Sequence, residues 1–583
     1  MHMHTKWRKT IPALLLAASL TVSAAPLAAS ARQELASAAQ SQGYSAKPMK
    51  LAGTVRAELK SAFVERGADG STIGVVIWLQ NDGAKVTRVP DYELRIVTGD
   101  GVSYTLTPSA SNPRAIQAKG KAELGYMLNV ERTDGLEPEK LAWVSVDEYV
   151  YPRKETTLLT MNIAGKVWQN ADPDGGSAGA VKWGQPFRLD MFSPNVTYTP
   201  VSMQKQATAQ GGIVTVVTVK ATNAGKEKAY LPDIAVSGSD GSKLYAGERA
   251  GGTTATLAAG ESRNIRFAIP TAAGVNLREF VVTTPERFAA AGGSALVFHV
   301  GHVRIGLPDN GFSLAGLSEY AYGTPIALDP LNELVDKDVR VSLVELHMHD
   351  NQGDGYKTAI AKFKLQNTGK EPAPLPAFQA DLTSAEGYTY SGVRQNTVAQ
   401  QLMPGLSHIV SYSFNVPKTE NAEKYALRLL EGGTTESPYS SPIADAVAVK
   451  VQSEAADSDV WDLYPFQVKM KYWWLSAVYE TVPNISYSYK LKLNLDIQGT
   501  DDVVVDANFS KLKFEIVDAF GKMLGSETVP LAGTGRLVSG YQTINFTNIR
   551  TEQQEYPLSI QVFEVIDTPN GEAKRLIKTF DQI

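Results

Sequence analysis

A polar segment that occurs three times at nearly constant spacing constrains this chain more than any other feature. The copies are IWLQNDGAKVTRVPD (77–91), VKATNAGKEKAYLPD (219–233) and FKLQNTGKEPAPLPA (363–377), which begin 142 and 144 residues apart. Self-similarity at a fixed period indicates a duplicated structural unit. The chain is therefore expected to consist of repeats of one fold.

The residues before each polar segment predict a β-strand that ends at a turn. Aligned on Asn81, Asn223 and Asn367, with Gly499 as a weaker fourth copy, the residues two, four and six places upstream are apolar and the residue one place upstream is polar. Alternation with period two is typical of a strand with one buried face. In Asn-x-Gly we expect the asparagine to bond its own backbone and the glycine to supply positive φ, so that the turn joins two strands.

Further turn and strand signals recur in the same phase. A second turn glycine follows each copy, and a proline, which suits the first residue of a strand, precedes each copy's first strand. We therefore expect an all-β chain of four antiparallel β-sandwich domains, with no long amphipathic helix. The glycines are Gly101, Gly241, Gly387 and Gly521, the prolines are Pro48, Pro186, Pro325 and Pro465, and the domains, called repeats 1 to 4 below, are 48–182, 183–321, 322–461 and 462–583.

The N-terminus predicts export. Lys6, Arg8 and Lys9 precede the short apolar run 11–22, and small residues at 29–31 suit cleavage, so residues 1–31 are expected to be a signal peptide. A polar lead-in, 32–47, would follow. The chain has no cysteine, hence no disulfide framework, and no later apolar run long enough to predict a transmembrane segment.

The charge balance gives no support to nucleic-acid binding. The chain has 56 Lys and Arg against 61 Asp and Glu. Removing the three basic residues of the signal leaves 53 against 61, a net charge of −8. Nucleic-acid binding proteins usually carry a basic patch or stripe, which this composition does not suggest.

One copy of the repeat resembles a known class of module. LQNTGKEPAPLP (365–376), the Leu-x-x-Gly at 402–405 and YSFNVP (412–417) are similar to the Asn-Thr-Gly pattern of bacterial immunoglobulin-like, cell-adhesion-related (CARDB-type) domains. The resemblance covers roughly 60 residues of each of the first three repeats. It implies immunoglobulin-like sandwiches with an extracellular binding, spacing or adhesive role, and it implies no catalytic residues.

The sequence favours a protein without catalytic activity. The repeats occupy almost the whole mature chain, and no metalloprotease, nucleophile-elbow or P-loop motif is present. One group invites a metal hypothesis, because alternation puts Glu345, His347 and His349 on one face of a strand. The alternative to a metal site, which we favour, is an ordinary polar face that carries two histidines. We therefore expect no cofactor.

Aromatic residues are the stronger functional candidates. Trp78 takes a position where the other repeats have Lys or Asp, so it is expected to point to solvent and to contact a sugar ring or a neighbouring domain. In MKYWWLSAVYE (470–480), Tyr472 and Trp474 share one strand face, which is either a domain junction or a binding platform.

Three functions are consistent with these observations. The leading hypothesis is a secreted, cell-envelope-associated protein that binds, adheres or acts as a scaffold at the bacterial surface or in the matrix, with polysaccharide or a surface protein as its partner. The first alternative is an extracytoplasmic accessory subunit that docks on a membrane protein complex. The second is a metal-dependent enzyme that uses the face of Glu345, His347 and His349.

Overall fold

Every regular element is a β-strand except one short 3-10 turn, so the all-β prediction is confirmed for the residues described. The predicted signal peptide and lead-in lie outside them. The computed structural model describes residues 48–67, 70–133, 135–169, 180–190, 192–207, 211–251, 256–307, 314–351, 355–432, 439–453, 459–481, 486–500, 502–506 and 508–582, and the 3-10 turn is η1 (Leu314–Gly316).

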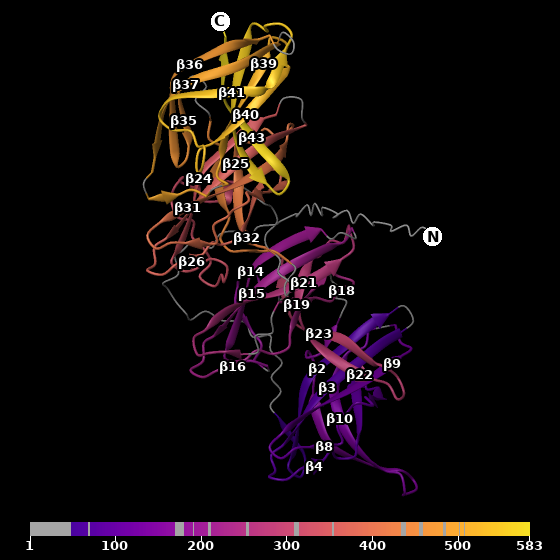
Figure 1. The fold of residues 1–583 in the computed structure, drawn as a ribbon. Helices are drawn as coiled ribbons and strands as arrows, with labels where there is room; N and C mark the ends of the chain where they lie inside the picture. Colours follow the sequence, from indigo (N-terminus) through magenta and orange to yellow (C-terminus); the bar gives the residue numbers. More distant parts are fainter. Residues whose placement is uncertain are drawn as a thin grey trace, which may run out of the picture. The chain divides into compact units, whose positions relative to one another are not determined.

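The chain forms two compact units (Figure 1). Unit 1 comprises the described residues up to 307 together with Tyr439. Unit 2 comprises the other described residues, from 314 onward. Residues 314–321, which the sequence places in repeat 2, belong to unit 2, where Tyr320 N donates to Ala448 O at 2.8 Å and the Tyr320 hydroxyl accepts from Leu343 N at 2.9 Å.

Unit 1 contains two pairs of sheets with the same strand path, and all their pairings are antiparallel except that of β12 with β2. In each pair, the first sheet carries the strand that ends at the polar turn, and the second sheet carries the strands that follow. For repeat 1 the first sheet is β1 (Met49–Ala52), β2 (Val55–Gly67), β3 (Gly70–Asn81), β9 (Lys121–Val130) and β7 (Thr107–Pro108), with β12 (Trp168–Gln169) beside β2; the second is β11 (Lys154–Asn162), β10 (Pro138–Asp147), β5 (Glu93–Thr98) and β6 (Ser103–Thr105); and β4 (Thr87–Arg88) pairs with β8 (Ala115–Ile116). For repeat 2 the first sheet is β13 (Phe187–Arg188), β14 (Val196–Ala207), β15 (Ile213–Asn223), β21 (Ser262–Thr271) and β19 (Glu248–Ala250); the second is β18 (Leu244–Tyr245), β17 (Ala235–Ser239), β22 (Glu279–Ala289) and β23 (Ala295–Gly306); and β16 (Ala229–Tyr230) pairs with β20 (Thr256–Leu257).

Unit 2 repeats this path twice more. For repeat 3 the first sheet is β24 (Val339–Asp350), β25 (Tyr356–Asn367), β31 (Ser407–Pro417) and β29 (Val393–Arg394); the second is β28 (Thr389–Ser391), β27 (Gln379–Thr383), β32 (Lys424–Glu431) and β33 (Ser441–Pro442), with β34 (Val447–Lys450) beside β32; and β26 (Ala373–Pro374) pairs with β30 (Gln401–Leu402). For repeat 4 the first sheet is β35 (Val460–Leu463), β36 (Phe466–Glu480), β37 (Ser486–Gly499) and β41 (Gly540–Thr551); the second is β40 (Met523–Pro530), β39 (Lys511–Asp518), β42 (Leu558–Thr568) and β43 (Gly571–Asp581); and β38 (Val503–Val504) lies beside β31 of repeat 3.

Apolar side chains from both sheets of a pair form one core, which is the arrangement of a β-sandwich. In repeat 3, Phe363 of the first sheet and Leu427 of the second belong to the same buried cluster. In repeat 4, Leu493 and Val562 do the same. The alternation read from the sequence thus marks the side chains that face the opposite sheet.

The Asn-x-Gly turn carries the chain from the first sheet to the second, and its asparagine is buried. Asn367 is 0% exposed; its Oδ1 accepts from Gly369 N at 2.8 Å, and its Nδ2 donates to Glu371 O at 2.8 Å and Leu402 O at 2.9 Å. The predicted positive φ of the glycine is wrong at all three turns. Glycine is needed for close approach instead, because a Cβ on Gly369 would lie 3.0 Å from Asp338 Cβ.

A β-bulge recurs at one position in all four first sheets, and the sequence analysis missed it. In each case it falls opposite the residues four and five places before the polar turn. A bulge inserts one unpaired residue, so the strand's side chains exchange faces beyond it. The bulged residues are Lys60 in β2, Val201 in β14, Val344 in β24 and Lys471 in β36.

Candidate functional site

The outer face of the first sheet of repeat 4 exposes aromatic side chains. Strand β36 directs Met470 into the core, and the bulge at Lys471 then shifts the phase so that Trp473 packs against the core. Tyr472 and Trp474 therefore point away from the core and are 48% and 57% exposed. The bulge, rather than simple alternation along the whole strand, sets which aromatic residues face outward.

Sheet pairing places a third aromatic side chain in the same face. Tyr472 lies opposite Asn494 of β37, and Asn494 lies opposite Tyr541 of β41, so that the amide stands between two tyrosines. Tyr541 is 79% exposed. The sequence analysis missed it, because β41 is distant along the chain and only the pairing of β37 with β41 brings it beside Tyr472.

Lysines lie beside these aromatic residues and in the rows on either side of them. The row after Tyr472 contains Trp474 opposite Lys492, and the row after that contains Lys490. On the other side of Tyr472, β36 carries Lys469. We call the side chains of Lys469, Tyr472, Trp474, Lys490, Lys492, Asn494 and Tyr541 the repeat 4 outer face.

The corresponding face in repeats 1 and 3 is covered by the next repeat. Aligned on the bulges, Tyr472 and Trp474 occupy the positions of Ser61 and Phe63 in repeat 1 and of Glu345 and His347 in repeat 3. Within unit 1, the Phe63 ring lies 5.0 Å from that of Phe298 on the second sheet of repeat 2. Ser61, Glu345 and His347 are likewise buried, and Phe63 is only 7% exposed.

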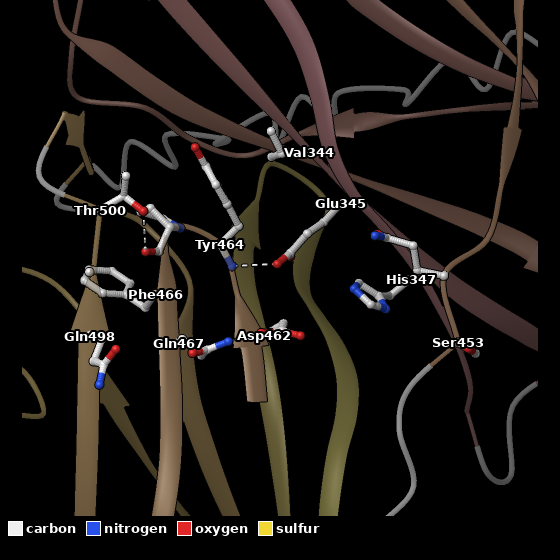
Figure 2. Close-up of a pocket in the computed structure, with 13 residues that line it drawn as sticks. Val344, Glu345, His347, Ser453, Asp462, Tyr464, Phe466, Gln467, Gln498 and Thr500 are labelled. Atoms are coloured by element: carbon white, nitrogen blue, oxygen red, sulfur yellow. Dashed lines mark hydrogen bonds between the residues drawn. The ribbon is translucent and has the colours of Figure 1, made fainter. Parts of the chain in front are cut away.

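A polar cleft of about 510 Å³ lies within unit 2, where repeats 3 and 4 meet (Figure 2). Val344, Glu345 and His347 of β24 line one side, and the start of β36 with the end of β37 lines the other. Glu345 Oε1 accepts a hydrogen bond from Tyr464 N at 2.6 Å, and Thr500 Oγ1 donates to Pro465 O at 3.3 Å. The remaining lining side chains include Gln452, Gln467, Gln498 and Asp462, so the cleft offers amide and carboxylate partners to a polar ligand.

The three residues of the metal hypothesis point into a protein interface. Glu345 is part of an ion network, His347 is 7% exposed beside the cleft, and the His349 ring lies 6.1 Å from that of Phe563 in repeat 4. Among the described residues, no three His, Asp or Glu side chains gather closely enough to hold a metal ion. The face that the sequence assigns to solvent is therefore the junction of repeats 3 and 4.

The ion network is a buried quartet with Lys362 and Arg575 as its cations. Lys362 Nζ lies 2.8 Å from Glu345 Oε2 and 2.7 Å from Glu564 Oε1, and Arg575 Nε lies 2.5 Å from Glu564 Oε2. Burial disfavours the charged form of Glu564, but Lys362 and Arg575 outweigh that cost and hold the pKa of Glu564 below its usual range. The quartet joins the two repeats of unit 2.

Trp78 occupies the outer face of its sheet, as the sequence predicts, but it is half-buried. Its ring centroid lies 5.9 Å from that of Phe192 in repeat 2, and Lys121 Nζ lies 4.4 Å from the ring. Its Nε1 donates to Glu123 Oε2 at 3.2 Å. Trp78 thus contributes to the junction of repeats 1 and 2.

Neither the described structure nor the sequence comparisons identify a membrane-spanning helix or a protein family. No helix among the described residues has the length and apolar character needed to cross a bilayer. No family model matches the sequence, and no curated protein is similar to it.

Proposed function

We propose that this protein is an exported, non-catalytic binding protein of the bacterial surface or matrix, built from four immunoglobulin-like sandwich repeats. Unit 2 presents the binding face, and the chain acts as an adhesive or scaffolding element. Polysaccharide is the ligand, and the repeat 4 outer face binds it by stacking Tyr472, Trp474 and Tyr541 on sugar rings.

One observation carries the proposal. The positions of Tyr472 and Trp474 are buried under protein in repeats 1 and 3, whereas in repeat 4 these two side chains and Tyr541 are 48%, 57% and 79% exposed. Large aromatic side chains that share one exposed face mark an interaction site more often than isolated ones do. Trp78, the other aromatic candidate, already has a protein partner in Phe192.

Co-sedimentation tests this function. Residues 32–583 would be incubated with isolated bacterial cell walls and with insoluble polysaccharides, beside the variants Trp474→Ala and Tyr541→Ala. Tyr230→Ala is the matched control, because Tyr230 is a 72% exposed tyrosine of repeat 2 and is not one of the residues of the repeat 4 outer face. Circular dichroism would verify that every variant is folded.

We expect wild type and Tyr230→Ala to sediment alike. Trp474→Ala should bind at least about tenfold more weakly, the effect usual for a central aromatic contact. If no wall or polysaccharide retains the wild-type chain, or if Trp474→Ala and Tyr541→Ala bind as wild type does, the proposal is rejected.

A further inference from the structure

We propose that the repeat 4 outer face selects an acidic polysaccharide, one whose sugars carry carboxylate or phosphate groups, and binds it along strands β36 and β37. This inference rests on the proposed function and adds the chemical class of the ligand. It is carried by the lysines that lie beside and on both sides of the aromatic rows of this sheet.

The lysines and the aromatic residues form successive rows of one surface. Lys469, Tyr472, Trp474 and Lys490 belong to four consecutive rows on the same side of the sheet, because the bulge absorbs the extra residue. Two residues of a strand span roughly 6.8 Å, so the four rows extend over about 20 Å. An extended polymer of charged rings matches this length, and the lysines on both sides of the aromatic rows, better than a single compact ligand does.

Three of the lysines on this side of the sheet lie beyond ion-pair distance of every carboxylate among the residues that the structure describes. Lys471, the bulged residue, lies 2.9 Å from Asp496. Within the part of the chain that the structure describes, no carboxylate lies within 4.0 Å of Nζ of Lys469, Lys490 or Lys492. The rows of Lys490 and Lys492 are adjacent and roughly 6.8 Å apart, which is less than the Debye length of about 10 Å at 0.1 M salt, so the fields of these two lysines add and attract a polyanion. Lys469 lies two rows beyond Lys492 and provides a separate positive charge at the other end of the face.

This local charge does not reflect the composition, because the whole chain has a net charge of −5. Lysines near the bulge in repeats 1 and 3 are neutralised. Lys60 lies 2.8 Å from both Glu123 and Glu286, and Lys362 contacts two carboxylates. Among the described residues, Lys490 and Lys492 of repeat 4 are by contrast exposed and have no carboxylate within 4.0 Å, so they are available to an external anion.

The polar side chains between the aromatic rings suit a hydrated ligand. Asn494 stands between Tyr472 and Tyr541, and Thr543 lies opposite Lys492. Along the same strands the face continues to Gln467 and Gln498, which line the cleft of Figure 2. Amide and hydroxyl groups beside aromatic rings provide hydrogen bonds to the hydroxyls of a sugar whose ring stacks on the aromatic face.

A covering protein sheet fits this face less well. Lys492 is seven places before the turn position, where repeats 1 and 3 have Gly74 and Ile360 beneath the next repeat. A protein sheet packed in the same way over repeat 4 would bury the ammonium group of Lys492 without a partner, which is costly. A flexible polyanion brings a counterion to each lysine and leaves water around it.

A pair of polymers with the same backbone tests the inference. Affinity of residues 32–583 would be measured for polygalacturonate and for its fully methyl-esterified form, which lacks the charge. A phosphorylated dextran, whose sugars carry phosphate, and a single-stranded DNA oligomer would serve as further probes. The variant Lys490→Gln/Lys492→Gln removes two cations, and Lys226→Gln/Lys228→Gln is its control, because these lysines are also exposed, two residues apart and beside an exposed tyrosine.

We expect polygalacturonate, the phosphorylated dextran or both to bind at least about tenfold more tightly than the esterified polymer, with binding weakened by salt. The preferred polymer identifies carboxylate or phosphate as the anion. The Lys490/Lys492 variant should lose about tenfold in affinity for it, and the control should not.

The failures of the two proposals are distinguishable. Equal binding of charged and esterified polymer, with both lost in Trp474→Ala, overturns the acidic ligand and leaves the proposed function standing. No binding to any polysaccharide overturns both. Tighter binding of the DNA oligomer than of every polysaccharide also overturns the inference, because it identifies a different class of polyanion.

Discussion

The buried ion quartet of unit 2 allows a prediction with a definite magnitude. The side chains of Lys362 and Glu564 are 0% exposed, and Lys362 Nζ lies 2.8 and 2.7 Å from its two carboxylate partners. At an effective dielectric constant of about 20, each such contact is worth roughly 6 kcal/mol of attraction. Desolvation of several kcal/mol per ion offsets most of this gain in the intact quartet.

Removing one charged member leaves its partners buried, and their desolvation cost is then no longer offset by attraction to that member. Lys362→Met should therefore lower the free energy of unfolding of unit 2 by about 3–5 kcal/mol, because Glu345 and Glu564 stay buried with only Arg575 nearby.

Replacing all four members should restore most of the loss. The variant Glu345→Gln, Lys362→Met, Glu564→Leu and Arg575→Met keeps the side-chain volumes similar and retains an acceptor for Tyr464 N. It should lie within about 2 kcal/mol of wild type. In unit 1 the four corresponding positions, by their bulges and strand pairing, hold the uncharged residues Ser61, Val76, Thr284 and Val300, and the ion pair of that junction is formed by Lys60 and Glu286 instead.

Hydrogen exchange in the full chain is the assay. The opening free energies of β24 and β43 report the stability of unit 2, and those of β2 and β3 in unit 1 are the internal reference. Measuring each unit separately avoids treating a chain with two units as a two-state system. A loss below about 1 kcal/mol in Lys362→Met would refute the reasoning, and so would a loss in the fourfold variant as large as in the single one.

The remaining predictions concern acid stability, one close contact and one turn. The pKa of Glu564 is lowered, so the stability it contributes is complete above the unfolded-chain pKa of about 4.3 and is lost as pH falls below it; a urea-midpoint series from pH 6 to 3 should show this loss in unit 2, and wild-type behaviour of the fourfold variant would contradict it. Burial and the charge of Lys60 lower the pKa of His302 to about 3, so unit 1 should lose stability as pH falls below about 6.5, where only the unfolded chain binds the proton; His302→Gln should flatten this slope between pH 6.5 and 5, and an unchanged slope would exclude His302 as its source. A Cβ on Gly301 would lie 2.4 Å from Trp168 Cε2, so Gly301→Ala should cost about 1–3 kcal/mol and shift tryptophan fluorescence, whereas unchanged emission and thermal midpoint would show that the indole adjusts freely. Asn367→Ala removes a buried amide that makes three turn hydrogen bonds and should cost about 1–3 kcal/mol in denaturant unfolding; a change below 0.5 kcal/mol, roughly the scatter expected at surface sites, would mean that water replaces it.

The aromatic site shows where reading the sequence succeeds and where it stops. Tyr472 and Trp474 were identifiable because alternation is local, and the structure does place them on one outward face. Tyr541 was not, because it joins them only through the pairing of β37 with β41. The sequence likewise could not show whether Lys492 has a carboxylate partner, because a partner on another strand produces no local sequence pattern.

The sequence by itself determined the repeated unit, the strand periodicity and the position of the polar turn, because these depend on short-range backbone and side-chain preferences. Tertiary structure alone decided which sheet faces are covered. Equivalent positions hold a buried Phe63 in repeat 1, a buried His347 in repeat 3 and an exposed Trp474 in repeat 4. Burial of an outer sheet face depends on which distant segment packs against it, and that is a property of the folded chain rather than of any local pattern.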